Sequence, residues 1–315
     1  MKRTLLLMGN DMLAAEQAEL DQKFEVIRLW KEPDPEATLQ ARRNDIVAIS
    51  SVVGVPVSRK LIESLPNLEI ISQFAVGFDN IDLQAAKERG IVVTNTPDIL
   101  TDCTADTAMC LLLAVTRRIC EADMFVRVGK WRSGKAFPLG ISPKGKTAGI
   151  VGLGRIGQAI AKRCEAFGMT IVYHGPHKKA DQPYKYYADL NEMAHDSDYL
   201  IVACRGGEAT MGLIDAPVLD ALGPKGFLVN ISRGTVLDEP ALVRALYNKT
   251  IAGAGLDVFI HEPNVPEELI SMDNVVLLPH IGSGTFETRT GMGRLVIANL
   301  EAHFAGQKLP TPVAA

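Results

Sequence analysis

Three charged residues, Arg233, Glu262 and His280, have the types and spacing for acid–base chemistry on a small anion. They stand in the runs Val-Asn-Ile-Ser-Arg-Gly, Gly-Leu-Asp-Val-Phe-Ile-His-Glu-Pro and Leu-Leu-Pro-His-Ile-Gly-Ser, each of which begins as an apolar strand. Ligands of open α/β sheets bind beyond the carboxyl ends of the strands, so we expect the three side chains to converge. Together they supply a guanidinium that binds an anion, an imidazole that transfers a proton, and a carboxylate that favours the protonated imidazole. This set of groups suits hydride transfer to a 2-oxo acid.

A glycine-rich turn precedes these residues. It follows the apolar run Thr147–Val151 and opens a helical pattern over Gln158–Phe167. The sequence Gly-Leu-Gly-Arg-Ile-Gly in this setting is typical of a dinucleotide-binding site, where the helix N-terminus attracts the phosphates. A glycine turn in an unrelated α/β protein is the alternative interpretation. The cofactor contacts expected here are Gly152, Gly154, Arg155, Ile156 and Gly157.

The end of the next strand distinguishes NAD from NADP. An NAD site usually places an acid there, about 20 residues after the glycines, to bind the ribose hydroxyls. This chain has Tyr-His-Gly-Pro-His-Lys-Lys over residues 173–179 and no acid before Asp181. An acid would repel a 2′-phosphate, whereas the basic side chains attract one, so the turn predicts NADP. A solvated basic turn is the alternative, and the expected contacts are His174, Gly175, His177 and Lys178.

Composition excludes several classes of function. The formal net charge of −4 gives no electrostatic footprint for nucleic acid or for an anionic membrane. The chain has five cysteines, no CxxC pair and no metal-ligand spacing, which favours reduced thiols in the cytoplasm and no bound metal. No apolar stretch reaches the roughly 18 residues of a transmembrane helix. The apolar start of the chain is too short for a signal peptide, so we expect a buried first strand.

Apolar runs alternate with helical patterns along the chain, which is typical of parallel sheets with crossover helices. The first part contains five predicted strands, at Thr4–Leu7, Glu25–Leu29, Ile46–Ile49, Ile70–Gln73 and Val92–Thr94. After an apolar helix over Thr101–Arg118, the second part contains six, at Thr147–Val151, Thr170–Tyr173, Tyr199–Val202, Phe227–Ile231, Ile251–Leu256 and Val275–Leu278.

We therefore predict an α/β protein of two doubly wound parallel-sheet domains, with the cleft between them. A flavodoxin-like substrate-binding domain comprises residues 1–98 and 285–315, and a Rossmann dinucleotide-binding domain comprises residues 99–284. The first domain is discontinuous because the last helix, Glu287–Phe304, has no strand of its own to serve and is expected to pack there. The tail Lys308–Ala315, which contains Pro310 and Pro312, is expected to be loose.

In this order, the motifs at residues 152–157, 230–234, 255–259 and 278–283 resemble the D-isomer-specific 2-hydroxyacid dehydrogenase family. They are most similar to its NADP-preferring glyoxylate/hydroxypyruvate reductase branch, and the likeness covers nearly the whole chain. It implies NADPH-dependent reduction of small 2-oxo acids to D-2-hydroxy acids. His280 would be the general acid/base, Glu262 would favour its protonated form, and Arg233 would hold the substrate carboxylate and carbonyl. Taken singly, these residues are also compatible with a core histidine, an ion-paired carboxylate and a helix-capping arginine.

The resemblance extends to further site residues. Backbone N–H groups at Val76 and Gly77 would bind the substrate carboxylate, although Gly77 also suits a simple turn of the chain. Many members carry a proline after the third strand of the nucleotide domain, where this chain has Cys-Arg-Gly-Gly. Cys204 there is equally compatible with core packing. The remaining implied contacts are Asp257, Ser283 and Trp131 for the substrate, and Cys204, Arg205, Ile231, Asp257 and Gly282 for the cofactor.

The resemblance also implies a homodimer built around an arm at Cys120–Pro143, with Trp131 either reaching the partner's active site or packing within the arm. Two other functions stay open. One is a broader reductase for larger 2-oxo acids such as phenylpyruvate. The other is a non-catalytic, nucleotide-sensing module of the corepressor type, although the chain has no low-complexity tail for protein interactions.

Overall fold

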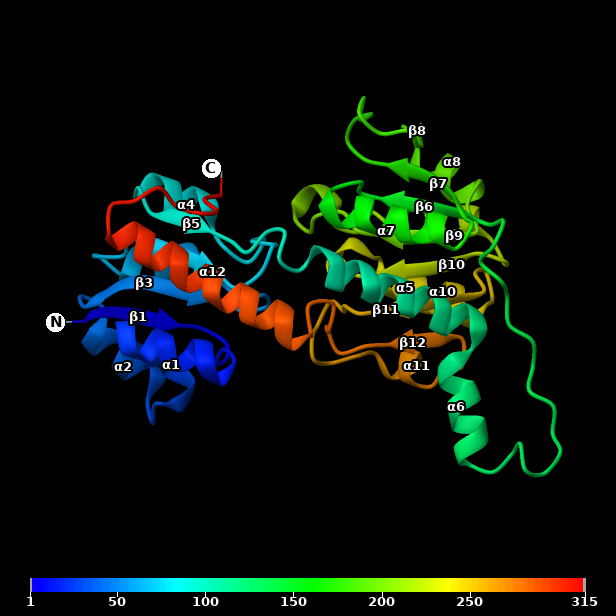
Figure 1. The fold of residues 1–315 in the computed structure, drawn as a ribbon, viewed down its shortest axis with the longest axis horizontal. Coiled ribbons are helices and arrows are strands. Elements are labelled where there is room, and N and C mark those ends of the chain that lie inside the picture. The colour runs from blue at the N-terminus through cyan, green and yellow to red at the C-terminus, as the bar shows by residue number, and fades with distance from the viewer. Residues whose placement is uncertain (1, 314–315) are drawn as a thin grey trace. The chain divides into compact units, whose positions relative to one another are not determined.

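A computed structural model describes residues 2–313, which fold into two compact α/β units (Figure 1). Unit 1 comprises the chain up to Leu100 together with the chain from Gly284 onward, and unit 2 runs from Thr101 to Ser283. Each unit is built on one parallel β-sheet. The predicted class, two doubly wound parallel-sheet domains, is confirmed.

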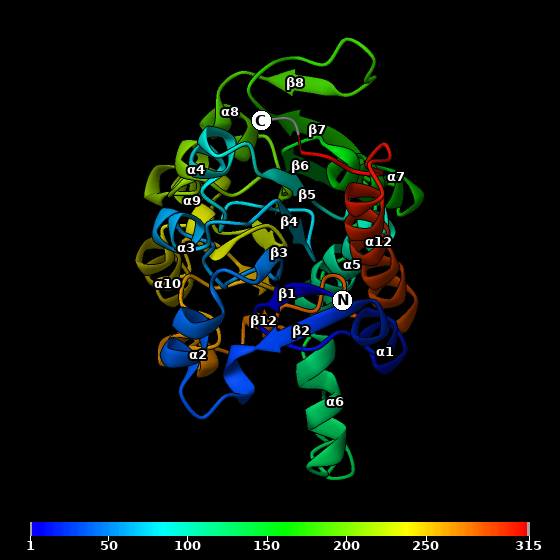
Figure 2. The same cartoon turned by 90° about the vertical axis from the view of Figure 1, so that its left-hand side faces the viewer.

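The sheet of unit 1 has the strand order β2-β1-β3-β4-β5, which is the flavodoxin-like order (Figure 2). Its strands are β1 (Arg3–Leu7), β2 (Phe24–Arg28), β3 (Ile46–Ser51), β4 (Ile70–Gln73) and β5 (Val92–Thr94). All five lie within two residues of the predicted runs. The side chains of Leu5, Leu6 and Leu7 are at most 1% exposed, so the expected buried first strand is confirmed.

Helices cover this sheet, and the last helix returns to it from the far end of the chain. The helices are α1 (Ala14–Lys23), η1 (Leu29–Lys31), α2 (Pro35–Arg42), α3 (Arg59–Ser64), α4 (Leu83–Glu88) and α12 (Phe286–Phe304). Helix α12 packs on β4 and against α1, which confirms its predicted place (Figure 1). Leu300 and Val296 on α12 are fully buried there.

The expectation of a loose C-terminal tail is wrong for its described part. Val313 donates its N–H to Val93 O at 2.8 Å, and Asn95 donates to Thr311 O at 3.3 Å. Proline lacks an N–H, but Pro310 and Pro312 alternate with residues that still pair. The segment therefore runs along β5, while residues 314 and 315 lie outside the described residues.

The sheet of unit 2 has seven strands in the order β12-β11-β10-β9-β6-β7-β8. They are β6 (Thr147–Val151), β7 (Thr170–His174), β8 (Lys185–Tyr187), β9 (Tyr199–Val202), β10 (Phe227–Asn230), β11 (Gly253–Leu256) and β12 (Val275–Leu277). The order outward from β6 is that of a Rossmann fold with one added strand. The predicted count of six was wrong because β8 is an edge strand of only three residues, Lys-Tyr-Tyr, that pairs only with β7.

Helices cover both faces of this sheet. They are α5 (Thr101–Arg117), α6 (Ile119–Arg127), α7 (Arg155–Ala166), α8 (Leu190–His195), η2 (Glu208–Thr210), α9 (Ala216–Leu222), η3 (Gly234–Val236), α10 (Glu239–Tyr247) and α11 (Glu267–Ile270). Helices α5 and α7 lie side by side on one face. Helix α6 projects away from the sheet in both views (Figures 1 and 2).

The strands of unit 2 are buried on both sides. In β9, Tyr199 and Ile201 join the apolar cluster beneath α5 and α7, whereas Leu200 and Val202 join the opposite cluster beneath α8, α9 and α10. Alternate side chains of a strand point to opposite faces of the sheet, so each of the two clusters packs against one face and both faces are buried. The loops at the carboxyl ends of the strands therefore start from a rigid base.

Candidate functional site

The predicted charged residues follow neighbouring strands at one edge of the unit 2 sheet. Arg233 follows β10, Glu262 lies on the loop after β11, and His280 follows β12. These strands are adjacent and parallel, so their carboxyl ends share one edge of the sheet. The three residues therefore come from three consecutive loops at that edge.

His280 and Glu262 are in direct contact. His280 Nδ1 lies 2.7 Å from Glu262 Oε2, and Phe259 donates its N–H to Glu262 Oε1 at 3.0 Å. Burial by itself raises the pKa of Glu262, but the hydrogen bond from His280 and the positive charges of His280 and Arg233 leave that pKa below its ordinary value. Glu262 is therefore ionised at neutral pH and can only accept. The proton on Nδ1 points at Glu262, which leaves Nε2 to face a reactant.

The backbone of His280 is held in an unusual conformation. Its φ of +54° lies in the left-handed region, which is uncommon for a residue other than glycine. Asp257 fixes the next two residues, because its carboxylate oxygens accept the N–H groups of Ile281 and Gly282, each at 2.7 Å. Burial raises the pKa of Asp257, and these two donors limit the rise. Asp257, predicted as a ligand contact, is thus placed where it holds the His280 loop.

A short turn positions Arg233 after β10. Asn230 Oδ1 accepts the N–H of Ser232 at 3.0 Å, and Asn230 Nδ2 donates to Arg233 O at 2.9 Å. A Cβ added at Gly234 would lie 1.9 Å from Phe259 C, so only glycine lets this turn approach the loop that carries Glu262. Neither Asn230 nor Gly234 was predicted from the sequence to be a site residue. The sequence does contain a feature that could have identified them: an apolar run is followed by an asparagine, and an Arg-Gly pair begins three residues after that asparagine.

The glycine-rich turn joins β6 to α7 as predicted. Gly152 has φ +93°, and a Cβ there would lie 2.5 Å from Cys204 Cα. A Cβ at Gly157 would lie 2.2 Å from Gly152 O, so this glycine lets α7 pack close to β6. By contrast, a Cβ at Gly154 would meet no atom within 4 Å. The turn therefore has open space above Gly154, beside the N-terminus of a 12-residue helix, which fits a bound pyrophosphate.

Other predicted cofactor residues surround this turn. Arg155 and Ile156 form the start of α7, exposed and half-buried respectively, and Ile231 is buried after β10. Cys204 and the exposed Arg205 follow β9, and Cys204 O accepts a hydrogen bond from Ser232 Oγ. Burial raises the pKa of the Cys204 thiol to about 11, so the thiol is protonated at neutral pH. The geometry favours packing for Cys204.

Two tyrosines hold the basic turn that follows β7. Tyr173 Oη accepts the N–H of Lys179 at 2.7 Å, and Tyr186 Oη donates to Gly175 O at 3.1 Å. His177 and Lys178 between these anchors are exposed. The turn thus presents two basic side chains from a fixed backbone. His174, at the end of β7, contacts Tyr187 O through Nδ1 at 3.1 Å and accepts the N–H of Gly152 through its carbonyl.

The remaining predicted residues lie elsewhere. Val76 and Gly77 are half-buried on the turn after β4 in unit 1. Gly282 is buried and Ser283 half-buried on the loop after β12. Trp131 lies beyond α6 and is 69% exposed, so the structure does not pack it as a core aromatic.

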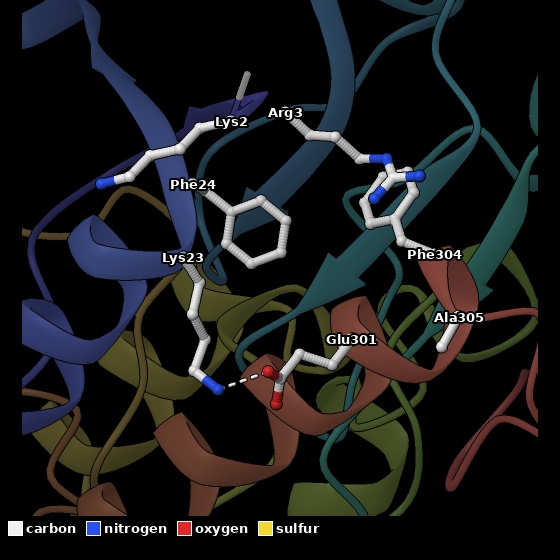
Figure 3. A pocket seen from close by; sticks show the side chains of 7 residues that line it. All are labelled: Lys2, Arg3, Lys23, Phe24, Glu301, Phe304 and Ala305. Carbon is white, nitrogen blue, oxygen red and sulfur yellow. Dashed lines mark hydrogen bonds and ion pairs between the residues drawn. The ribbon is translucent and has the colours of Figure 1, made fainter.

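A surface hollow in unit 1 lies away from the carboxyl ends of the strands (Figure 3). Arg3 and Phe24, the first residues of β1 and β2, face α12 there. The Arg3 guanidinium sits 4.4 Å from the centre of the Phe304 ring, and Lys23 forms an ion pair with Glu301. These contacts tie α12 to the amino ends of the strands, opposite the edge where ligands bind in such sheets.

Residues 2–313 contain no group of three or more His, Cys, Asp or Glu side chains arranged to hold a metal ion. None of the helices described is both long and apolar enough to cross a membrane.

The sequence model of the D-isomer specific 2-hydroxyacid dehydrogenase, NAD binding domain, matches residues 109–282. The chain is 50% identical over 308 residues to a glyoxylate/hydroxypyruvate reductase A of Arabidopsis thaliana, covering 98% of both chains. It is 49% identical over 308 residues to a hydroxyphenylpyruvate reductase of Plectranthus scutellarioides, again covering 98% of both.

Solved structures give the same result. The crystal structure of the NADPH-dependent glyoxylate/hydroxypyruvate reductase from Sinorhizobium meliloti in complex with NADP and malonate superposes with a TM-score of 0.92. That protein is 43% identical, and the match covers 100% of this chain and 97% of the other.

Proposed function

Because this chain belongs to the D-isomer specific 2-hydroxyacid dehydrogenase family, we propose that it reduces glyoxylate and hydroxypyruvate with NADPH. The product would be a 2-hydroxy acid, of D configuration where the carbon is chiral. The observation that carries the proposal is the 2.7 Å contact between His280 and Glu262, on the same sheet edge as Arg233. The relatives named for glyoxylate/hydroxypyruvate reduction support the substrate class.

Each of the three charged residues would have a different role toward the substrate. His280 would give a proton from Nε2 to the carbonyl oxygen, while the reduced nicotinamide supplies the hydride to the carbon. Glu262 accepts from Nδ1 and stabilises the imidazolium. Arg233 would bind the carboxylate and polarise the carbonyl through its planar fork. The backbone N–H groups of Val76 and Gly77 would bind the same carboxylate, with Ser283 and Trp131 as further substrate contacts.

A nicotinamide dinucleotide is the cofactor of this family, and we infer NADP as the form used here. The residues around the glycine-rich turn would hold the pyrophosphate. His177 and Lys178 would bind the 2′-phosphate, and the NADP complex of the Sinorhizobium meliloti relative supports this preference. We assign Cys204 to packing beside Gly152, and we assign the cofactor to Gly152, Gly154, Arg155, Ile156, Gly157, His174, Gly175, His177, Lys178, Arg205, Ile231, Asp257 and Gly282.

We further infer a homodimer built on the arm Cys120–Pro143. Six apolar side chains on this arm are between 40% and 95% exposed, and exposed apolar side chains gathered on one segment are typical of a surface that contacts another chain. They are Met124, Val126, Val128, Trp131, Leu139 and Ile141. Light scattering should give the mass of two chains, and Val126→Asp should lower it; a monomeric wild type would reject the dimer.

The proposed compartment is the cytoplasm. The five cysteines form no disulfide within residues 2–313, as reduced thiols in that compartment require.

A second candidate substrate is a hydroxyphenylpyruvate, because the hydroxyphenylpyruvate reductase of Plectranthus scutellarioides is nearly as similar as the first relative. The deciding experiment is initial-rate reduction of glyoxylate, hydroxypyruvate and hydroxyphenylpyruvate, each with NADPH and NADH. We expect the highest kcat/KM with NADPH and a small substrate. A preference for the aromatic acid would favour the second candidate. NADPH binding without turnover on any substrate would favour a nucleotide-sensing module.

A further inference from the structure

Two carbonyl oxygens of the turn after β4 are held by the two consecutive residues that follow β5. Thr96 donates its N–H to Ala75 O at 2.9 Å, and Asn95 Nδ2 donates to Val76 O at 2.8 Å. Ala75 O shares its peptide with the N–H of Val76, and Val76 O shares its peptide with the N–H of Gly77. Both peptides are trans and planar, so each carbonyl points opposite to the N–H of its own peptide. The two hydrogen bonds therefore set the directions of the Val76 and Gly77 N–H groups.

The N–H groups so oriented have no acceptor within the described chain. Among residues 2–313, neither Val76 N nor Gly77 N donates a hydrogen bond, although both residues are half-buried. A main-chain N–H that is shielded from water is costly to leave unpaired. Two adjacent N–H groups with fixed directions suit the oxygens of a carboxylate, which would form charge-assisted hydrogen bonds with them.

The orientation of the Asn95 amide is determined by its partner. A carbonyl oxygen can only accept, so Nδ2 of the amide, and not Oδ1, must face Val76 O. The side chain of Asn95 is 9% exposed, so water competes little for this donor. Of the two hydrogen bonds that set the N–H directions, this one alone is made by a side chain. A substitution of Asn95 can therefore remove it and leave the backbone bond from Thr96 in place.

The main chain of Asn95 is fixed by the C-terminal segment that runs along β5. Asn95 donates its N–H to Thr311 O at 3.3 Å, and Thr311 Oγ1 donates to Asn95 O at 2.6 Å. Asn299 on α12 holds Thr311 in turn. Its Oδ1 accepts the N–H of Thr311 at 3.1 Å, and its Nδ2 donates to Thr311 Oγ1 at 2.8 Å. The donor that holds Val76 O therefore extends from an anchored main chain.

We propose that Asn95 is a positioning residue that directs the N–H of Gly77 toward the carboxylate of the 2-oxo acid. This inference rests on the proposed function. Asn95 acts through the peptide between Val76 and Gly77, and its contribution is to fix the direction of a donor that every residue other than proline possesses. Without the Asn95 amide, the Gly77 N–H remains present but is no longer held in one direction. Asn95 therefore controls substrate affinity and leaves proton and hydride transfer to other groups.

The first test is Asn95→Leu, which removes the donor and keeps a side chain of similar size. We expect KM for glyoxylate to rise about tenfold, as for the loss of one charge-assisted hydrogen bond. We expect kcat and KM for NADPH to change less than about twofold, because neither depends on the direction of the Gly77 N–H. Calorimetry with oxalate on the NADPH-loaded protein should show a similar loss of affinity without any turnover.

A second variant, Asn95→Asp, keeps the shape of the side chain and guards against misfolding of the first. Its ionised carboxylate cannot donate to Val76 O, whereas its protonated form regains an O–H donor, and burial raises the pKa of such a carboxyl. We compare each variant with wild type at the same pH, from about 8.5 to about 5. Oxalate affinity of Asn95→Asp should start below that of Asn95→Leu and rise above it as the pH falls. Loss of charge repulsion alone would bring Asn95→Asp only to the level of Asn95→Leu.

The matched control is Asn67→Leu. Asn67 Nδ2 also donates to a main-chain carbonyl, Asn44 O at 2.7 Å, but near the amino ends of β3 and β4, so its loss should leave KM unchanged. Three results would overturn the inference: oxalate affinity of Asn95→Leu equal to wild type, an equal loss of NADPH affinity, or recovery of Asn95→Asp only to the level of Asn95→Leu. A wild type that binds oxalate in an Asn95-dependent way but reduces no 2-oxo acid would instead refute the proposed function alone.

Discussion

The two units present polar groups at the carboxyl ends of their strands in different ways. In unit 2 the groups are charged side chains, and His280 and Glu262 are joined directly at 2.7 Å. In unit 1 they are the main-chain N–H groups of Val76 and Gly77, and the carbonyl of the peptide between these two residues accepts from the neutral amide of Asn95 at 2.8 Å. Unit 2 therefore carries groups that can gain or lose protons, whereas the turn in unit 1 carries groups that can only bind.

Substitutions in the two units should therefore affect different kinetic constants. A substitution of a charged side chain in unit 2 removes the reacting group itself, so the rate of the chemical step should fall. A substitution behind the turn in unit 1 only misdirects donors that remain present, so binding should weaken. The comparison is refuted if changes in the two units affect kcat and KM alike.

The largest effect is expected for His280→Ala. The variant loses the group proposed to give the proton to the carbonyl oxygen, so kcat should fall by about 10²- to 10⁴-fold. The dissociation constant of NADPH, measured by fluorescence titration, should stay within about twofold, because the glycine-rich turn is unchanged. His303→Ala is the matched control, since His303 lies on α12 and pairs with Glu69 in unit 1. Full turnover by His280→Ala would assign the proton transfer to another group.

The sequence predicted that the three charged residues lie at one edge of the sheet, and the reason is physical. A charged residue directly after an apolar run is visible in the sequence, and parallel strands bring such residues to one edge. That reasoning placed Arg233, Glu262 and His280 without knowledge of a single distance. It assigned Asp257 only as a ligand contact, because nothing in the sequence shows that its carboxylate holds two backbone N–H groups of the His280 loop.

The next effect concerns pH. The pKa of Glu262 lies below its ordinary value, so the carboxylate is ionised throughout the neutral range and stabilises a protonated His280. Glu262→Gln removes that charge. Under the proposed mechanism reduction requires a proton on His280, so the fall in rate on the alkaline side should move to lower pH, with a loss of about tenfold on that side. The pH–rate profile of kcat checks this, with Glu301→Gln as an isosteric control. An unmoved profile would show that the contact does not tune the proton transfer.

Main-chain functions and long-range pairings were harder to predict. Every residue has an N–H, so no residue type marks Val76 and Gly77, and only the resemblance to a family singled them out. The tail was misjudged because its pairing partner, β5, lies more than 200 residues away in the sequence, as the bridge between Thr94 and Pro312 shows. Strand β8 was missed because a run of only three residues carries no periodic signal.

A smaller effect, confined to cofactor selection, is expected at the basic turn. The double variant His177→Ala, Lys178→Ala removes two exposed bases that would face the 2′-phosphate. KM for NADPH should rise about tenfold at low salt, while KM for NADH should stay within about twofold. Lys225→Ala controls for loss of a surface charge elsewhere in unit 2. Equal losses with both cofactors would mean that these side chains do not bind the 2′-phosphate.

The smallest effect tests whether unit 2 also uses a buried side chain to direct a turn, as Asn95 does in unit 1 through its hydrogen bond to Val76 O. Tyr173 is 1% exposed, and its hydroxyl accepts the N–H of Lys179 behind the basic turn. Tyr173→Phe removes one neutral hydrogen bond, worth about 1 kcal/mol, so KM for NADPH should rise about fivefold with kcat unchanged. Tyr247→Phe on α10, where the tyrosine is 80% exposed, should have no effect. A loss limited to NADPH would extend positioning by a buried side chain to both units. If NADPH and NADH were affected equally, Tyr173 would only stabilise the fold of the sheet. Positioning of a turn by a buried side chain would then be a feature of unit 1 and not of unit 2.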